Sequence, residues 1–366
     1  MTVQRRRRAG FSLPELLIAL VIGMVVITAG TDFAVQTFKS RRGWVVREGV
    51  DRNARYVGLS LQRDASEAGV AIESSSSFAS VQALGDTLSL LSIPWISLGG
   101  MAPAEAPVYP LHDDGGAGVA YPPGGNCGPT CLELDVAGQL VNFSYPSLVQ
   151  LRVGTVRRLL LVTSGGFAVG GTRLRLNFRD VPTFIGRPSG LASLPLLRSG
   201  TSVQQVRAVQ YWRNAADNTL QRAERFSETG EARGEAVAMG VTAFTARLRF
   251  TDGGEGATYN GLDADSTNDG NDIIGLRVRV RLEADRTDPA VNSGARLGRW
   301  YEWRMSPRNL LYEKTRSGPS RMVARPRRQA GGGARVSAAV AGAQDPAGLL
   351  KSTVGAARAA ASVTSK

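Results

Sequence analysis

Oxygen-bearing side chains crowd into one short stretch of the sequence, residues 261–272. Its aspartates are Asp263, Asp265, Asp269 and Asp272. Carboxylate and amide oxygens in a loop are the ligands that calcium takes. The order of an EF-hand is absent, because Asn268 stands where that motif has glycine and no glutamate closes the loop. A polar hairpin loop, which asparagine and aspartate favour, is the preferred interpretation, and a calcium site is the alternative.

The two cysteines, Cys127 and Cys131, lie close together in the stretch NCGPTC. With a single histidine in the chain, His112, they cannot complete a four-ligand zinc site without carboxylates. Gly128 and Pro129 between them favour a turn. Outside the cytoplasm such a pair is expected to close a small loop as a disulfide, whereas in a reducing compartment it stays two free thiols.

The sequence offers no recognisable catalytic centre. His112 lies in a segment rich in glycine, proline and aspartate, where no partner for general base catalysis is evident. The Gly-x-Ser-x-Gly pattern, the Walker phosphate loop and the HExxH zinc motif are all missing from the sequence. We therefore predict that the protein is not an enzyme and that it holds no cofactor unless calcium binds.

The net charge of +13 is carried by the two ends of the chain. Arg5, Arg6, Arg7 and Arg8 supply one part, and residues 314–366 supply the rest. Residues 11–313 are neutral overall, so net charge gives no indication of a DNA-binding face on the folded part. The tail at residues 314–366 is rich in alanine, glycine, serine and arginine, and is predicted to be a disordered, solvated extension. The alternative for this tail is a basic arm that touches DNA or anionic surfaces.

An uncharged apolar run, residues 16–31, follows the four arginines. Extended to residues 11–38 it is long enough for a membrane-spanning helix, and the arginines would hold its N-terminal end in the cytoplasm. A secretory signal peptide would need a small-x-small cleavage site, and Thr28-Ala29-Gly30 is a poor one. A plain membrane anchor leaves the carboxylate of Glu15 unexplained, because a charge near the hydrocarbon is costly.

The start of this run resembles the N-terminus of the type IV prepilin family, in which a basic leader ends in glycine before phenylalanine and a glutamate follows. The matching positions are Gly10, Phe11, Ser12, Leu13 and Glu15. The resemblance implies that a prepilin peptidase cuts between Gly10 and Phe11 and methylates the new Phe11 amine. It also implies that Glu15 pairs with the Phe11 ammonium of a neighbouring subunit in a filament, which would relieve two buried charges.

A long helix is predicted to continue beyond the membrane. Apolar residues recur at Val46, Val50, Val57, Leu61 and Ala68, a spacing that keeps them on one face of a helix. After a leader at residues 1–10, the predicted spine helix covers residues 11–69, with residues 11–38 in the membrane or the filament core. The letters NARY, RD and AG between residues 52 and 69 resemble the matching segment of the PilW-type minor pilins.

Residues 70–313 are predicted to form a β-rich exported domain. A polar run at residues 74–77 is interpreted as a linker, and the glycine- and proline-rich stretch 99–129 as a long loop. Alternating or apolar segments predict strands at residues 87–96, 131–136, 140–145, 148–153, 156–163, 172–178, 203–212, 236–250, 273–282 and 300–305. Whether these strands form one sheet or two stays open.

The resemblance to the PilW-type minor pilins extends loosely into this region, at Tyr211, Leu220, Arg222 and a closing Arg308-Asn309. It implies an α+β, pilin-like fold, in which a long N-terminal spine helix packs on antiparallel β-sheet. The expected protein is a minor pilin of the bacterial inner membrane, single-pass, with a cytoplasmic N-terminus and an exported globular domain. Its expected partners are other minor and major pilins, the prepilin peptidase and the inner-membrane assembly platform.

Two other functions share the N-terminal signal. A type II secretion pseudopilin has the same leader, junction and apolar helix, so the sequence separates it poorly from a pilin. A DNA-uptake pilin would bind nucleic acid through residues 314–366, which is not the favoured interpretation of that tail, because thinly spread basic residues bind weakly.

Overall fold

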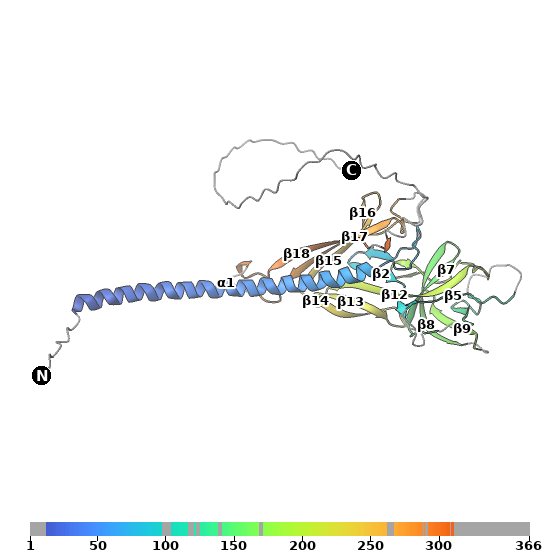
Figure 1. Cartoon of the computed structure of the whole chain (residues 1–366), viewed down its shortest axis with the longest axis horizontal. Helices are drawn as coiled ribbons and strands as arrows, with labels where there is room; N and C mark the ends of the chain where they lie inside the picture. Colours follow the sequence, from blue (N-terminus) through green and yellow to red (C-terminus); the bar gives the residue numbers. More distant parts are fainter. Residues whose placement is uncertain are drawn as a thin grey trace, which may run out of the picture. The chain divides into compact units, whose positions relative to one another are not determined.

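The computed structural model of the chain describes residues 12–96, 104–115, 121, 125–137, 141–167, 171–261, 267–287, 289, 292–307 and 309–310. The predicted leader, Phe11 and the predicted basic tail lie outside the described residues. Within the described ranges, one long helix is followed by antiparallel strands, which confirms the predicted α+β, pilin-like architecture (Figure 1). 

The strands are short and numerous. In chain order they are β1 (Val81–Leu84), β2 (Thr87–Ser92), β3 (Trp95–Ile96), β4 (Ala104–Glu105), β5 (Val108–Pro110), β6 (Cys131–Asp135), β7 (Ser147–Val153), β8 (Val156–Phe167), β9 (Arg173–Arg179), β10 (Thr183–Phe184), β11 (Arg187–Pro188), β12 (Thr201–Asn214), β13 (Thr219–Phe226), β14 (Ala232–Met239), β15 (Val241–Phe250), β16 (Glu255–Gly256), β17 (Ile273–Glu283) and β18 (Gly298–Met305). A 3-10 turn at Asn292–Gly294 precedes β18.

The helix, α1 (Leu13–Glu67), has 55 residues and a length of about 80 Å at 1.5 Å per residue. Pro14 lies in its first turn, where the missing amide hydrogen removes no helical hydrogen bond. The helix ends at Glu67, and Gly69 then takes a φ of +78°, which glycine adopts without strain. The predicted end of the spine helix is therefore right to within two residues.

One stripe of α1 is buried, and it is the stripe that the 3.6-residue periodicity predicts. Val50, Ala54, Val57, Leu61 and Ala65 are at most 4% exposed and belong to one apolar core. The neighbouring Gly58 lets the helix approach β18 closely: a Cβ atom there would lie 2.5 Å from Nε1 of Trp303. The second half of the helix is thus fixed by packing, while the first half is not.

Two sheets cover this stripe. One is four-stranded, in the order β16-β15-β17-β18, and its inward-facing residues such as Phe244, Leu248, Val278 and Val280 pack in the same core as α1. The other is built from β1, β2, the second half of β12, β13 and β14. We call α1 and these strands the spine module.

The first half of β12 and five other strands close into a small barrel. The first half of β12 pairs with β5 on one side and β7 on the other, and the ladder continues through β8, β9 and β6. An antiparallel bridge between Leu111 and Leu134 joins β6 back to β5 and closes the ring. The interior is filled by a second apolar core, which includes Leu134, Val149, Leu160, Leu176 and Val203. We call these six strands the barrel.

Five predictions about local structure are wrong, one of them the single strand at residues 87–96, which is two strands in different sheets, β2 and β3. The expected strand at residues 140–145 is absent over residues 141–145, where Phe143 and Tyr145 instead stack at 6.3 Å and Phe143 lies against the barrel core. The expected strand at residues 236–250 is two strands, because Gly240 takes a φ of +73° between β14 and β15.

The other two corrections concern segments predicted to lack structure. Residues 74–77 form a tight turn in which Ser75 and Phe78 exchange backbone hydrogen bonds, and not a linker. The predicted loop at residues 99–129 contributes β4 and β5, of which β5 is a member of the barrel. Strands of two or three residues are too short to show a periodic pattern in the sequence.

Candidate functional site

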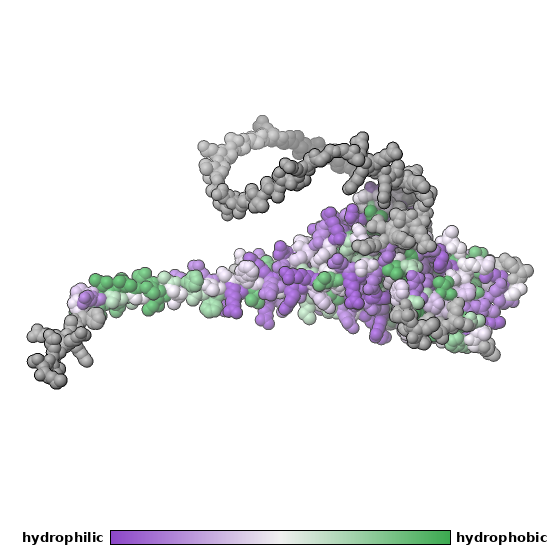
Figure 2. All heavy atoms as spheres, in the orientation of Figure 1, coloured by the Kyte–Doolittle hydropathy of each residue, from purple (hydrophilic) through white to green (hydrophobic). Residues whose placement is uncertain are grey.

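The first half of α1 presents an apolar surface that no other described residue covers. From Leu13 to Phe38 every large apolar side chain is between 48% and 76% exposed. In Figure 2 this hydrophobic surface occupies the first part of the helix and gives way to hydrophilic surface before the helix reaches the sheets. By length and composition, this part of α1 is suited to cross a membrane. In water such a surface would have to be covered by lipid or by other helices.

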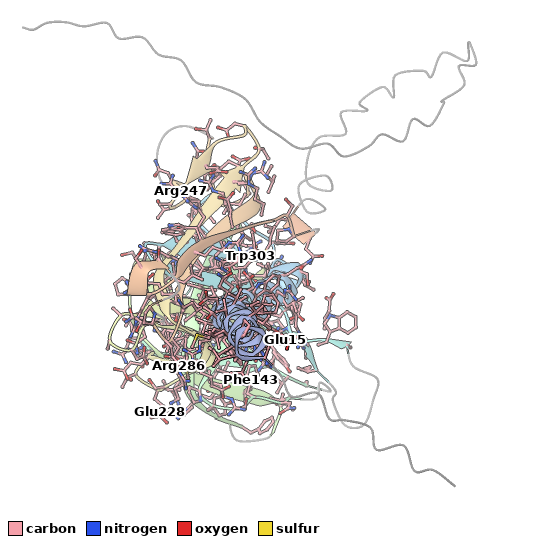
Figure 3. The ribbon with its side chains drawn as sticks, turned by 90° about the vertical axis from the view of Figure 1, so that its left-hand side faces the viewer. Glu15, Phe143, Glu228, Arg247, Arg286 and Trp303 are labelled. Atoms are coloured by element: carbon pink, nitrogen blue, oxygen red, sulfur yellow. A yellow bond between two sulfur atoms is a disulfide. The ribbon has the colours of Figure 1, made fainter. Side chains whose placement is uncertain are left out.

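Glu15 is the one acidic residue in the first turn of α1. Its carboxylate accepts hydrogen bonds from the backbone N–H of Ser12 at 3.0 Å and from the Ser12 hydroxyl at 2.9 Å. A carboxylate at this end of a helix also interacts favourably with the helix dipole. Figure 3, which looks along the helix from its N-terminal end, labels Glu15 on the end-on helix α1. Gly10 and Phe11, the predicted processing positions, lie outside the described residues.

The second half of α1 is bound to the sheets by a buried ionic cluster around Asp64. The Asp64 side chain is 1% exposed and receives two hydrogen bonds from the guanidinium of Arg222, at 2.7 and 2.9 Å. The Tyr211 hydroxyl donates a third, at 2.5 Å, and is itself within 2.7 Å of the Ser60 hydroxyl. A buried charge that is bonded on several sides is stabilised, whereas an unpaired one is very costly.

More exposed charges surround this centre. Arg207 bonds to both Glu67, in the last turn of α1, and Glu224 on β13, and Arg222 also bonds to Glu224. Burial raises the pKa of Tyr211, and its hydrogen bond to Asp64 raises it further. The hydrogen bond to Asp64 raises the pKa of Arg222, which therefore stays charged. The cluster links helix, β12 and β13 through charge-assisted hydrogen bonds.

A pH dependence of stability follows from Glu224. Burial alone would raise the pKa of this carboxyl, but hydrogen bonds from Arg207 and Arg222 outweigh burial and lower it below 4.5. A lowered folded-state pKa gives stability that is complete above the unfolded value and is lost as the pH falls through the folded value. We expect Glu224→Gln to melt below the wild type at pH 7, and the difference in melting temperature to shrink as the pH falls through the lowered folded-state pKa, as measured by thermal unfolding. A difference in melting temperature that does not change with pH would contradict this assignment.

Two smaller clamps lie on either side of the Asp64 cluster. Next to the start of the buried stripe of α1, Asp51 accepts hydrogen bonds from the Tyr301 hydroxyl and, at 3.3 Å, from Arg299. Burial, followed by the bond to Asp51, raises the pKa of Tyr301 to about 12. At the end of the helix, the Asn309 side-chain amide donates to the Ser66 carbonyl at 3.2 Å, one of the carbonyls that a helix end leaves without a helical partner.

Some of the residues that carry the sequence resemblance lie in these contacts. Asp64 of the RD letters contacts both Tyr211 and Arg222, and Asn309 contacts the end of α1. Sequence reasoning did not predict that they meet. The sequence did contain a sign of this contact. Asp64 lies three residues after Leu61 and seven after Val57, which places it on the buried stripe of the helix, and a buried carboxylate needs a partner.

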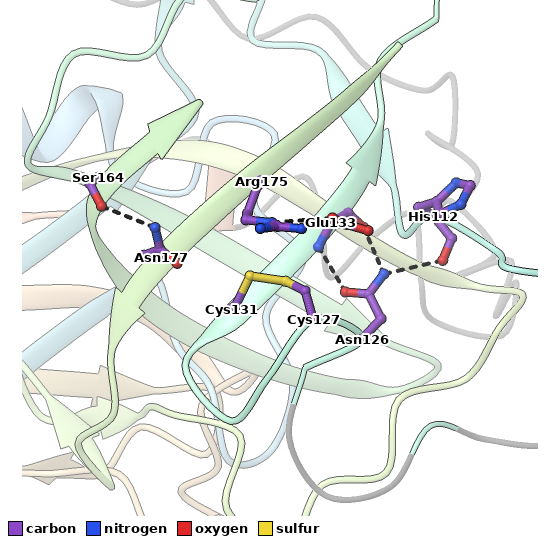
Figure 4. The surroundings of a disulfide bond; sticks show 8 residues. All are labelled: His112, Asn126, Cys127, Cys131, Glu133, Ser164, Arg175 and Asn177. Atoms are coloured by element: carbon purple, nitrogen blue, oxygen red, sulfur yellow. Dashed lines mark hydrogen bonds and ion pairs between the residues drawn. A yellow bond between two sulfur atoms is a disulfide. The ribbon is translucent and has the colours of Figure 1, made fainter. Parts of the chain in front are cut away.

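The two cysteines lie at the edge of the barrel. Cys131 begins β6, and in the structure its sulfur is bonded to that of Cys127, with the two Cα atoms 5.4 Å apart (Figure 4). The side-chain amide of Asn126 donates to the Glu133 carbonyl at 3.1 Å and to the His112 carbonyl at 3.3 Å. The loop is therefore positioned to hold the start of β6. That Cys127 and Cys131 are oxidised to a disulfide in the cell stays a prediction.

The proposed calcium ligands are divided by the limits of the described structure. Asp263 and Asp265 lie outside the described residues, while Asp269 is buried and Asp272 follows it on the same loop. Among the described residues no group of three or more histidine, cysteine or acidic side chains is arranged to hold a metal ion. The loop also packs on the turn at residues 75–78, since the Gly270 amide donates to the Ser76 carbonyl at 2.8 Å. A calcium site there stays a prediction.

The comparisons with known proteins bear on the N-terminus. Residues 5–31 match the prokaryotic N-terminal methylation motif, the signal of pilins and pseudopilins. Neither the curated proteins nor the solved structures include a match to the chain. The proteins that carry this motif are structural rather than enzymatic. The motif, together with the long apolar helix and the antiparallel sheets, supports a membrane-anchored, type IV pilin-like protein.

Proposed function

We propose that the protein is a minor pilin that takes part in the initiation, assembly or capping of a type IV pilus. The observation that carries this proposal is the division of α1 into two halves: one is fixed to the sheets by Asp64 and its partners, and the other presents an exposed apolar surface. A membrane holds the exposed half before assembly, and the helices of other pilins cover it afterwards. Its partners are therefore other minor and major pilins and the assembly platform in the inner membrane.

Processing prepares the helix for this exchange. A prepilin peptidase cuts between Gly10 and Phe11, removes the four arginines of the leader and methylates the Phe11 amine. The new ammonium group lies four residues before Glu15 in the sequence. In a filament, Glu15 of one subunit then pairs with the Phe11 amine of its neighbour, and each charge satisfies the other in apolar surroundings. The bonds from Ser12 leave the Glu15 side chain exposed and accessible to such a partner.

The mass of the mature N-terminal peptide, taken from membranes of the native host, tests the processing step. We expect a peptide that begins at methylated Phe11. An intact N-terminus at Met1 would reduce the protein to a membrane-anchored domain. A cut after the apolar run would make it a secreted protein, and either result would overturn the pilin assignment.

A deletion strain separates the pilus from the type II secretion system. We expect loss or reduction of surface pili with normal secretion of exoproteins. The opposite pattern would assign the protein to the secretion system as a pseudopilin. DNA uptake is not favoured, and deletion of residues 314–366 should leave transformation unchanged where pili are still made.

A further inference from the structure

The helix carries a dense group of cations just beyond its apolar half. Lys39, Arg41, Arg42 and Arg47 lie within nine residues, and no acidic residue occurs between Asp32 and Glu48. All four side chains are exposed. No described residue gives any of them a hydrogen bond or an ion pair, whereas the arginines of the Asp64 cluster each bond to two carboxylates. The partner of these four charges is therefore to be sought outside the described part of the chain.

The four cations surround the helix and do not share a face. A helix turns by about 100° per residue, so the gaps between neighbouring side chains around the axis are about 60° to 120°. A protein surface that docked on one side of the helix would meet one or two of them. A layer that surrounds the helix would meet all four, which is the situation of a helix that crosses the headgroups of a bilayer.

The position of the four cations along the helix axis places them at the level of the headgroups. About 20 residues at 1.5 Å per residue cross a hydrocarbon core of about 30 Å. Counted back from Phe38, this length ends close to Ile18 and leaves Glu15 among the headgroups on the other side. Lys39 then emerges first, and longer side chains further along can bend back toward the interface. Trp44 lies among the cations with 73% of its surface exposed, and tryptophan is enriched at membrane interfaces.

We propose that Lys39, Arg41, Arg42 and Arg47 form a collar that binds the headgroups of anionic phospholipids in the outer leaflet of the membrane. The proposal rests on the membrane anchor of the proposed function, but not on a role in the pilus. The collar fixes the depth of the helix and holds the globular part close to the leaflet until the subunit is extracted.

The collar also explains why the leader must be basic. Cations on the exported flank oppose export under the positive-inside rule. The four arginines before Gly10 equal them in number and so offset this opposition while the chain is being inserted, and they are no longer needed once the helix is in place. Cleavage then leaves the collar as the main cationic group of the mature helix's first 37 residues, which span positions 11–47.

The test is a lipid-selectivity measurement on the full chain in vesicles. Phosphatidylglycerol or phosphatidylcholine carries a nitroxide near the top of its acyl chain, which quenches tryptophan fluorescence at short range. The signal of Trp44 is obtained as the difference from the Trp44→Phe variant. Each cation at an anionic surface contributes about fivefold in binding, so we expect at least about a fivefold preference for phosphatidylglycerol at low salt. The preference should fall as salt screens the charges.

A matched pair of triple variants locates the effect. Lys39→Gln/Arg41→Gln/Arg42→Gln keeps only Arg47 of the collar and should lose most of the preference for phosphatidylglycerol. Arg52→Gln/Arg55→Gln/Arg63→Gln removes the same charge from exposed positions higher on the same helix and should keep the full preference. Equal quenching in the wild type, a preference in the first variant as large as that of the wild type, or loss of the preference in the second variant would overturn the collar. Absence of quenching by either lipid would overturn both the collar and the membrane anchor. The role in the pilus is tested separately, by counting surface pili.

Discussion

Arg222→Met is expected to destabilise the protein by about 3–5 kcal/mol, because it leaves the carboxylate of Asp64 buried without its main partner. The Asp64 side chain is 1% exposed, so water cannot replace the two hydrogen bonds that the guanidinium donates. Methionine has a similar length and keeps most of the apolar contacts of the arginine side chain. The measurement is urea or thermal unfolding of the full chain in detergent, followed by circular dichroism.

Two variants separate the lost ion pair from a general effect of substitution. Arg225→Met changes an exposed arginine on the same strand and should alter stability by no more than about 0.5 kcal/mol. Asp64→Leu/Arg222→Met removes both charges and should recover most of the loss, since a buried pair replaced by apolar residues is often close to neutral. A double variant as unstable as Arg222→Met would show that the charges are not what binds the helix to the sheet.

Glu15→Ala is expected to abolish incorporation into pili while leaving the fold of the globular part intact. The carboxylate is exposed and its bonds are to Ser12 alone among the described residues, so its removal costs the subunit almost nothing. In the filament, by contrast, it would leave the Phe11 ammonium of the neighbour unpaired in apolar surroundings, a cost of several kcal/mol. Because about 1.4 kcal/mol corresponds to a tenfold change, even part of that cost would lower incorporation into pili at least tenfold.

The measurement compares the protein in sheared pili with the protein in membranes by immunoblot. Ser12→Ala is the matched control: it removes the hydroxyl that donates to Glu15 but keeps the carboxylate, and it should still be incorporated. Glu15→Ala found in pili at the wild-type level would refute the pairing with Phe11, even if processing after Gly10 were normal.

The parts of the fold that the sequence predicts are those in which apolar residues recur with the period of a helix or a strand. The stripe through Val50, Val57 and Leu61 identifies the buried face of α1 because a helix repeats every 3.6 residues. The alternation of Val278 and Val280 with arginines identifies β17 because neighbouring side chains on a strand point to opposite faces. In both cases the prediction needs no knowledge of what the face packs against.

The parts that it does not predict depend on partners far away in the chain. Asp64 lies on the stripe, yet only the fold places Arg222 beside it, across a sequence separation of 158 residues. The barrel is closed by the contact of Leu111 with Leu134, on segments that have no common period. At residues 141–145 an alternation of aromatic and polar residues predicts a strand, but the rings of Phe143 and Tyr145 instead lie against the barrel without strand pairing.

The course of β12 has a mechanical consequence. Its 14 residues run without interruption from the barrel into the sheet that α1 carries, so a force applied along the spine reaches the barrel through covalent bonds and the ladders on both sides. A linker between two domains would let the outer one swivel and absorb such a load. Here the shared strand joins the two parts directly, so in the proposed pilus a pulling force on the spine would reach the barrel without such a swivel.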